Sequence, residues 1–367
     1  MNPGVRRPLN GMIYNDTSVK TGRRHAVPVV ASRVMLALQL LVAASASAAQ
    51  PDLSISTSPR HVYKENDGRD LKGSTESFVF RLVVRAADAE AAEPIGATVD
   101  LRAGQRTVKS IRLSGDALAS LREKLGKFSA DADALYALRL GFNEPVAERI
   151  DHVAIRLESK GSSASLDVPV TEYVQKTKLV FPLRGDFMVV TGHVTAPQGH
   201  QERSQLYAYD ILGLGSHLEL LTGDGSKNDD FVGFGKEVLA PAAGVVTYAR
   251  DDVADNPSTG NQDFEKLLAQ ADPPWGVGGN CVVIDHGNGE WSFLAHMRRG
   301  SLKVKKSDHV AQGQTVGQLG NSGATTGPHL HYHLMDGPRI LVFDGLPARF
   351  ENTCHPMPKP GVYCDAR

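Results

Sequence analysis

The hydrophobic residues of this chain fall mainly in short runs that alternate with polar residues or are continuously apolar, which is typical of β-strands. Two stretches, 116–128 and 131–140, instead place leucines at helical spacing, and we expect helices there. In the first part of the chain, the strand-like runs cover residues 77–85, 97–101, 107–113, 153–157 and 164–170. The pattern predicts a small β or α+β domain over residues 50–177.

From residue 178 onward the apolar runs are punctuated by glycines, and helical periodicity almost disappears. The predicted strands here are 207–211, 236–240, 244–249, 281–286, 291–296, 314–320 and 329–335. This pattern favours an antiparallel β-sandwich or partly open barrel over residues 178–350. The stretch 250–279 interrupts the rhythm and predicts an insertion that walls a cleft, with one helical turn at 264–268. A Pro-rich tail, 351–367, follows.

An apolar segment near the N-terminus, VMLALQLLVAA at 34–44, follows Arg33 and precedes a run of small residues at 45–49. A basic flank, a short apolar core and an A-x-A-like site are the parts of a secretory signal peptide. The core is shorter than the about 20 residues of a membrane-spanning helix. We therefore expect residues 1–49 to be a signal peptide with a long basic flank, and the protein to be periplasmic or extracellular. An uncleaved membrane anchor is the alternative.

The charge of the chain is nearly balanced, with 40 Lys and Arg against 41 Asp and Glu. Six of the basic residues and only one acid lie in residues 1–49, so the remainder carries 34 basic and 40 acidic residues. An acidic body with 6% aromatic residues has neither the basic surface nor the stacking platform of a nucleic-acid-binding protein. Nucleic acid is therefore excluded as the expected partner.

The three cysteines show no CxxC spacing, so a metal site in this chain must use histidines and carboxylates. Cys281 lies in the apolar run CVVI and is expected to be buried in a strand. Cys354 and Cys364 bracket the Pro-rich tail and can close a disulfide loop in an oxidising compartment.

Ten of the thirteen histidines lie after residue 190, and the densest group is GPHLHYH at 327–333. On a strand, alternation directs His329, His331 and His333 to one face. A metal ion accepts such imidazoles in the neutral form, whereas an exposed polar strand face is the alternative.

Other candidate ligands lie on neighbouring predicted strands. His200 precedes the strand that carries Asp210, and His296 ends the strand 291–296. Together with the group at 327–333, they supply the imidazoles and carboxylate that zinc hydrolases use for three ligands and an open water position.

Several segments, in this order along the chain, resemble the M23 (lysostaphin/LytM-type) zinc metallopeptidases, which are peptidoglycan endopeptidases. The segments are AYD at 208–210, VLAPAAGVV at 238–246, NCVVIDHG at 280–287, FLAH at 293–296, VAQGQTVG at 310–317 and GNSGATTGPHLH at 320–331. The resemblance implies a mainly β, LytM-like fold with a duplicated hybrid motif for residues 178–350. It does not account for residues 50–177.

Residue by residue, the resemblance implies that His200, Asp210 and His331 bind one Zn²⁺ and that His296 and His329 are catalytic imidazoles. Zinc would lower the pKa of a bound water and polarise the scissile carbonyl. His329 would act on that water as general base or hydrogen-bond partner, and His296 would steady the oxyanion or assist proton transfer. The implied partner is the peptide portion of peptidoglycan.

Two positions depart from the family's pattern. The first His and Asp are usually four positions apart, whereas His200 and Asp210 are ten apart, so His193 is a rival first ligand. His333 replaces a commonly acidic residue, and it either orients another imidazole or lies exposed on its strand.

Three functions are compatible with these features. The first is an exported zinc endopeptidase that hydrolyses peptide bonds of peptidoglycan cross-links. The others are a non-catalytic LytM-like module that regulates another cell-wall hydrolase, and a zinc peptidase that acts on proteins or peptides. The presence of every ligand and catalytic residue type favours an enzyme, while the oligomeric state is not indicated.

Overall fold

The computed structural model describes residues 53–66, 75–90, 92–123, 125, 130–192, 200, 202–257, 259–260, 275–354, 356–358 and 363–366. The predicted leader and the helical turn predicted at 264–268 lie outside these residues. Residues 50–367 group into one compact unit by their contacts. In the part of the chain that the structure describes, no helix is long and apolar enough to cross a membrane.

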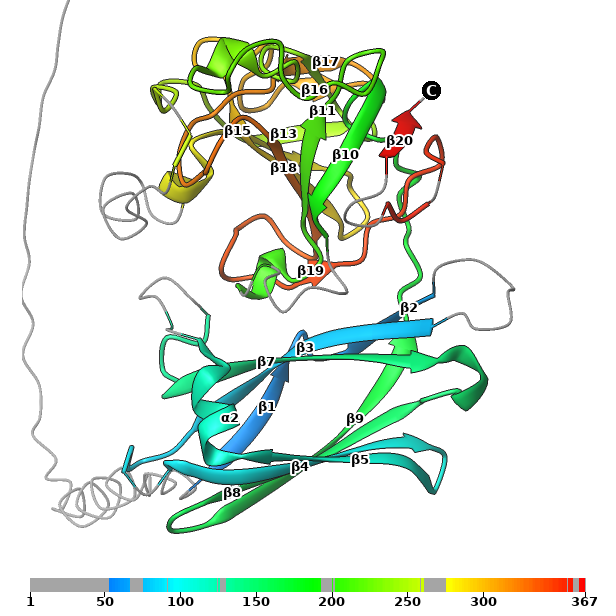
Figure 1. Cartoon of the computed structure of the whole chain (residues 1–367), viewed down its shortest axis with the longest axis vertical. Helices are drawn as coiled ribbons and strands as arrows, with labels where there is room; N and C mark the ends of the chain where they lie inside the picture. Colours follow the sequence, from blue (N-terminus) through cyan, green and yellow to red (C-terminus); the bar gives the residue numbers. More distant parts are fainter. Residues whose placement is uncertain are drawn as a thin grey trace, which may run out of the picture. The chain divides into compact units, whose positions relative to one another are not determined.

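The first half of the compact unit forms a nine-stranded sheet among the described residues, which we call the first sheet. Its order is β5-β4-β8-β9-β2-β3-β7-β6, with β1 on β3, and β2 and β9 are the one parallel pair among those described. Figure 1 shows β3 and β7 in one layer and β4, β5 and β8 in the other. The strands are β1 (Ser54–Ser58), β2 (Val62–Asn66), β3 (Thr75–Arg85), β4 (Pro94–Ala103), β5 (Arg106–Ser114), β6 (Arg122–Glu123), β7 (Tyr136–Pro145), β8 (His152–Ser159) and β9 (Ser163–Glu172).

The core of the first sheet lies between its two layers. Alternate residues of β3 point into it, and these are Phe78, Phe80, Leu82 and Val84. The opposite face of β3 is buried as well, since Val79 and Arg81 are both fully shielded from solvent. A strand that is covered on both faces must have a second partner beyond its own sandwich.

The helices predicted in the first sheet are shorter than expected or absent. The helix α2 (Gly115–Ser120) begins where the Ser114 hydroxyl accepts a hydrogen bond from the Ala117 amide at 3.3 Å. The helix predicted over 131–140 is wrong, because residues 136–145 form β7 and pair with β3 along its length. There Leu138 and Leu140 both join the buried core of the first sheet, so cross-strand pairing outweighs the local helical spacing.

The second half forms another open nine-stranded sheet, the second sheet, with the order β16-β13-β14-β15-β18-β11-β10-β20 and β19 on β18. A separate two-stranded ribbon, β12 with β17, completes it. The mainly β prediction is confirmed, and no barrel closes among the described strands. The strands are β10 (Gly185–Thr191), β11 (Tyr209–Gly213), β12 (Glu237–Leu239), β13 (Gly244–Arg250), β14 (Asn280–Asp285), β15 (Trp291–Met297), β16 (His309–Val310), β17 (Thr315–Gln318), β18 (Leu330–Met335), β19 (Gly345–Leu346) and β20 (Tyr363–Ala366).

Short 3₁₀ turns lie between strands of both sheets. In the first half η1 (Val146–Glu148) follows β7, and in the second half they are η2 (Arg203–Gln205), η3 (Asn228–Asp230) and η4 (Trp275–Gly278). Cys281 is a buried free thiol in β14, as expected, and Cys354 is disulfide-bonded. The tail contributes β20, which pairs with β10.

The segment between the two sheets is fixed by one buried carboxylate. Glu290, which is fully shielded from solvent, accepts hydrogen bonds from the backbone amides of Lys176 and Thr177, each at 2.8 Å. The Tyr173 hydroxyl donates to the same carboxylate. The predicted division into two domains at residue 177 stays a prediction.

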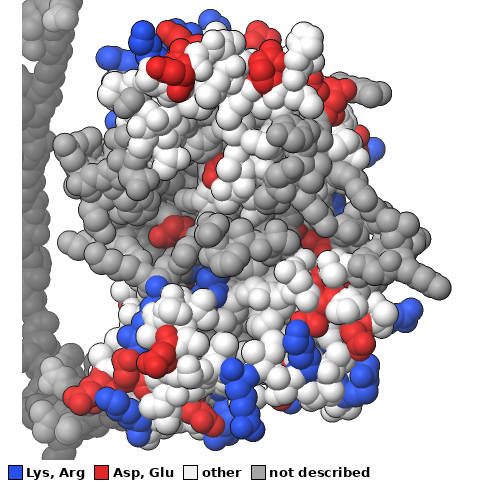
Figure 2. Space-filling model, in the orientation of Figure 1, with Lys and Arg blue, Asp and Glu red and all other residues white. Residues whose placement is uncertain are grey.

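The surface carries both signs of charge. Figure 2 shows Lys and Arg side chains interspersed with Asp and Glu on the described part of this face. Some of them form ion pairs, such as Arg102 with Asp167 at 3.2 Å. Exposed pairs of this kind contribute about 0–1 kcal/mol each, so the fold depends on its cores and buried polar groups.

Candidate active site

Three of the side chains predicted to bind a metal come together at one end of the second sheet. The donor atoms of His200, Asp210 and His331 all lie within 4.8 Å of one another. His200 Nε2 is 3.3 Å from Asp210 Oδ2, and His331 Nδ1 is 2.9 Å from Asp210 Oδ1. Asp210 and His331 are directly paired across β11 and β18, so the sheet itself fixes them side by side. His193, the rival ligand, lies outside the described residues.

The two predicted catalytic imidazoles face each other in the same place, with ring centroids 4.7 Å apart. The Nδ1–H of His296 donates to the Ser322 carbonyl at 2.8 Å, and that of His329 donates to the Gly327 carbonyl at 2.9 Å. Because a carbonyl only accepts, each ring carries its proton on Nδ1, which leaves Nε2 for the pocket. His329 Nε2 lies 3.4 Å from Asp210 Oδ1.

The backbone at His296 has a φ of 61°, which is rare for a residue other than glycine. Such a conformation costs about 1–3 kcal/mol and persists only where the surroundings impose it. Ser322 does so here. Its hydroxyl donates to the Met297 carbonyl at 2.7 Å and accepts from the Asn280 amide at 2.9 Å, while its carbonyl holds the His296 ring. The sequence indicates Ser322 only as part of a loop that aims the following strand, and it does not reveal these contacts because they join three separate segments.

His333 is buried, so the exposed alternative is wrong. Its Nδ1 lies 3.0 Å from His331 Nε2, and its ring packs on Phe293 with a centroid separation of 4.9 Å. The His331 ring is therefore held at both nitrogens, with Nδ1 directed to Asp210 and Nε2 to His333. His333 therefore orients another imidazole, which is the first of the two alternatives that the sequence left open.

Burial and neighbouring charge set the protonation of the cluster. Burial raises the pKa of Asp210, but the attraction of His200 and His329 outweighs it and holds this pKa well below the ordinary value. Burial lowers the pKa of His331 to about 4 and that of His296 well below 6.5. Burial also lowers the pKa of His329, yet Asp210 outweighs it and leaves the pKa raised. Near neutral pH the Asp210 carboxylate is therefore ionised and the His331 imidazole is neutral, the forms in which these groups bind metals.

These groups line a pocket of about 240 Å³. Its wall includes Val277 and Gly278 of η4, at the described end of the predicted insertion, and residues 261–274 lie outside the described part. Thr325, which the sequence places in the same loop, contacts the site directly, because its hydroxyl lies 3.0 Å from His329 Nδ1. A pocket lined by the His296 and His329 imidazoles beside a His-Asp-His cluster suits metal-assisted hydrolysis.

A family model for peptidase family M23 matches residues 229–340. The chain carries a peptidase M23 domain. The matched range contains His296, His329 and His331, whereas His200 and Asp210 precede it. The peptidoglycan DD-endopeptidase ShyA of Vibrio cholerae is 47% identical over 57 residues, which are 16% of this chain and 13% of ShyA. The match therefore spans a small part of that relative's length.

Solved structures of other proteins also match this chain. The catalytic domain of the prophage-encoded M23 protein EnpA from Enterococcus faecalis is 19% identical, with a TM-score of 0.27 over 44% of this chain and 87% of EnpA. A zinc-containing peptidase from Vibrio cholerae is 13% identical, with a TM-score of 0.27 over 73% of this chain and 56% of that one. TM-scores this low support no conclusion, so the assignment of the M23 domain depends on the family model.

Proposed function

We propose that this chain is an exported, zinc-dependent endopeptidase that hydrolyses peptide bonds of peptidoglycan cross-links. The observation that carries the proposal is the convergence of His200, Asp210 and His331 beside His296 and His329 in one pocket. The names of the relatives support the substrate class, since ShyA and ShyC of Vibrio cholerae are peptidoglycan DD-endopeptidases.

The donor set fits zinc. Two imidazoles and one carboxylate converge, their donor atoms lie within 4.8 Å, and this is a ligand combination of catalytic zinc sites. A bound zinc ion supplies a water of lowered pKa and polarises the scissile carbonyl. His200, Asp210 and His331 are the residues that would hold it, with His193 as the alternative to His200.

His333 prepares His331 for that role. In the hydrogen-bond pattern described above, His331 Nδ1 faces Asp210 and Nε2 faces His333 Nδ1. A ligand nitrogen must lose its proton, and the other ring nitrogen then carries it. His333 Nδ1 lies where it accepts a hydrogen bond from that Nε2–H, so the His331 ring keeps its orientation in both protonation patterns.

The two remaining imidazoles move protons and bind developing charge. His329 lies beside Asp210, so its Nε2 takes the proton of the attacking water and later passes it to the leaving amine. His296 faces it from β15, and its Nε2 assists that transfer and, when protonated, hydrogen-bonds to the oxyanion. The carbonyls of Ser322 and Gly327 keep both rings aimed at the pocket.

Export is proposed from the predicted signal peptide at 1–49. Its direct test is the N-terminal sequence of the protein recovered from the periplasm or medium, which we expect to begin near residue 50.

The function is tested with purified protein by measuring bound zinc and the loss of turbidity of a peptidoglycan suspension. We expect His331→Ala to lose zinc and activity, and His329→Ala to keep zinc and lose activity. The exposed His309 provides the matched control, and His309→Ala should behave like the wild type. Wild-type protein that binds no zinc and releases no muropeptides contradicts the proposal. If His193→Ala loses zinc and His200→Ala does not, His193 and not His200 is the first zinc ligand.

A further inference from the structure

The covered outer face of β3 identifies a contact between the first sheet and the candidate active site. On this face Val79 forms a buried apolar cluster with Leu206 and Tyr207, and Tyr63 of β2 packs against it. The Tyr207 hydroxyl donates to the Val79 carbonyl at 3.2 Å. Leu206 and Tyr207 belong to the segment that connects His200 to Asp210. The partner of the outer face of β3 is therefore the segment that carries two of the candidate metal ligands.

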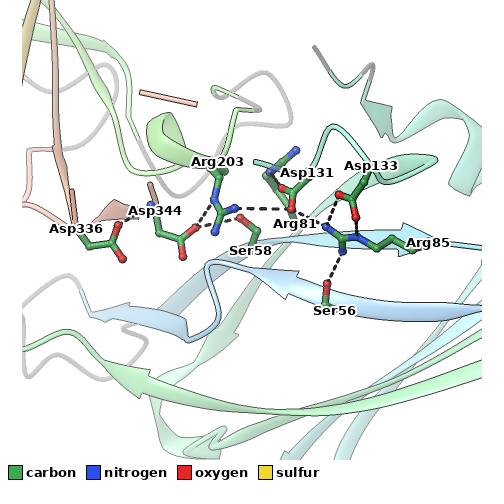
Figure 3. A network of polar contacts seen from close by, with 9 residues as sticks. All are labelled: Ser56, Ser58, Arg81, Arg85, Asp131, Asp133, Arg203, Asp336 and Asp344. Carbon is green, nitrogen blue, oxygen red and sulfur yellow. Dashed lines mark hydrogen bonds and ion pairs between the residues drawn. The ribbon is translucent and has the colours of Figure 1, made fainter. Parts of the chain in front are cut away.

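A polar contact reinforces the apolar one. Arg203, the first residue of η2, lies between two carboxylates (Figure 3): its Nε donates to Asp344 Oδ1 at 2.8 Å, and its Nη1 is 3.7 Å from Asp131 Oδ1. Asp131 belongs to the first half of the chain, where it also pairs with the fully buried Arg81 at 3.0 Å. On the other side, the Ser58 hydroxyl of β1 donates to Asp344 at 3.1 Å. Arg203 thus ties the ligand-bearing segment to the first sheet through a largely buried network.

The same turn is held from the second sheet. The Ser204 hydroxyl accepts from the Leu341 amide at 3.1 Å, and the Leu341 carbonyl accepts from the Ala130 amide at 3.0 Å. The Ser204 carbonyl lies 2.6 Å from where a Cβ at Gly345 would be, so only glycine permits this approach of β19. The turn is therefore fixed on both sides. Its position constrains where His200, which precedes it, and Asp210, which follows it, can lie.

We propose that the first sheet positions the metal-binding segment, with Arg203 and Tyr207 as the positioning residues. Neither residue contacts the metal site itself. Each holds the segment three residues from a ligand, Arg203 after His200 and Tyr207 before Asp210. This gives the first half of the chain a role in the site, and it rests on the proposed function, because it takes His200 and Asp210 as zinc ligands.

The test is the zinc dissociation constant of the full chain, measured by competition with a colorimetric chelator at fixed pH. Loss of groups that orient metal ligands typically weakens metal binding about 10- to 100-fold. We expect about a tenfold weakening in Arg203→Met, a smaller weakening in Tyr207→Phe, and partial recovery in Arg203→Lys, which restores the charge but not the fork of donors.

Two control variants separate positioning from general stability. Arg102→Met removes an ion pair of the first sheet that lies away from the segment, and Ile155→Val loosens the core of that sheet. Both should bind zinc as the wild type does, even where the melting temperature falls. If Arg203→Met binds zinc as tightly as the wild type, or if Ile155→Val weakens zinc binding as much as Arg203→Met does, the positioning inference is wrong while the proposed function stands. Wild-type protein that binds no zinc contradicts the proposed function and the inference together.

Discussion

Replacing Ser322 by alanine tests how the fold holds the strained His296. The Ser322 side chain is fully buried, and its hydroxyl connects two backbone groups, the Asn280 amide at 2.9 Å and the Met297 carbonyl at 2.7 Å. Alanine keeps the backbone and removes only this hydroxyl. The Ser322 carbonyl, which accepts from His296 Nδ1, stays in the chain but loses its side-chain support.

The expected cost follows from which groups lose a partner. The buried Asn280 amide is left unsatisfied, which costs about 1–3 kcal/mol. The Met297 carbonyl keeps a second hydrogen bond, from the Asn280 side-chain amide at 3.0 Å. Losing its bond from the Ser322 hydroxyl therefore costs only about 0.5–1.5 kcal/mol of stability. We therefore expect Ser322→Ala to lower the free energy of unfolding by about 2–4 kcal/mol.

The assay is urea unfolding followed by tryptophan fluorescence. The two tryptophans of the chain, Trp275 and Trp291, both lie in the second half and report on the region around Ser322. The midpoint should fall with little change in the slope. In the zinc-loaded protein, peptidase activity should fall at least tenfold with zinc content unchanged, because a small displacement of a catalytic group is costly.

The matched control is Ser110→Ala, which removes an exposed serine hydroxyl from the first sheet and should change stability by less than about 0.5 kcal/mol. A loss below about 0.5 kcal/mol in Ser322→Ala as well would refute the reasoning, since the hydroxyl would then contribute nothing to the two buried backbone groups.

Three further predictions test other parts of the molecule. Glu290→Gln removes the charged acceptor of the segment between the sheets, and the Lys176 and Thr177 amides should exchange with deuterium at least about tenfold faster; unchanged exchange would contradict the role of this carboxylate. Burial lowers the pKa of His286 below 6.5 in the folded state, so unfolding takes up a proton and the free energy of unfolding should fall as the pH drops below about 6.5. His286→Gln should make the free energy of unfolding depend less on pH between about pH 7 and 5. An unchanged pH dependence would show that other groups cause it. Gly279→Ala should destabilise by more than about 1 kcal/mol in the same urea assay, because residue 279 has a φ of +62° and a Cβ there would lie 2.4 Å from the Ser322 backbone; a neutral effect would mean that this turn can shift.

Local sequence patterns predicted many of the described strands, because alternation and glycine punctuation are properties of each segment alone, but they did not predict β1, β2 or β10. The helix predicted over 131–140 failed for the opposite reason. Leu135 and Leu138 have a helical spacing, whereas Leu138 and Leu140 have the spacing of a strand, and pairing with β3, more than fifty residues away in sequence, decides between them. Long-range pairing of this kind leaves no local signal.

The candidate site shows the same division. The spacing of His329, His331 and His333 predicted that they share one face, because a strand directs alternate residues to one face; β18 itself begins at Leu330, directly after His329. The sequence did not predict the carbonyls that orient the imidazoles, the contacts of the Ser322 hydroxyl or the contact of Arg203 with Asp131. Backbone acceptors and contacts between distant segments have no residue pattern of their own.

The proposed chemistry is tested most directly by mass spectrometry of purified cross-linked muropeptide dimers after incubation with the zinc-loaded protein. We predict that the wild type converts the dimers to monomers with a gain of one water for each bond cut, that a chelator stops the conversion, and that added zinc restores it. Dimers that stay intact with zinc-loaded, folded wild-type protein would contradict the account.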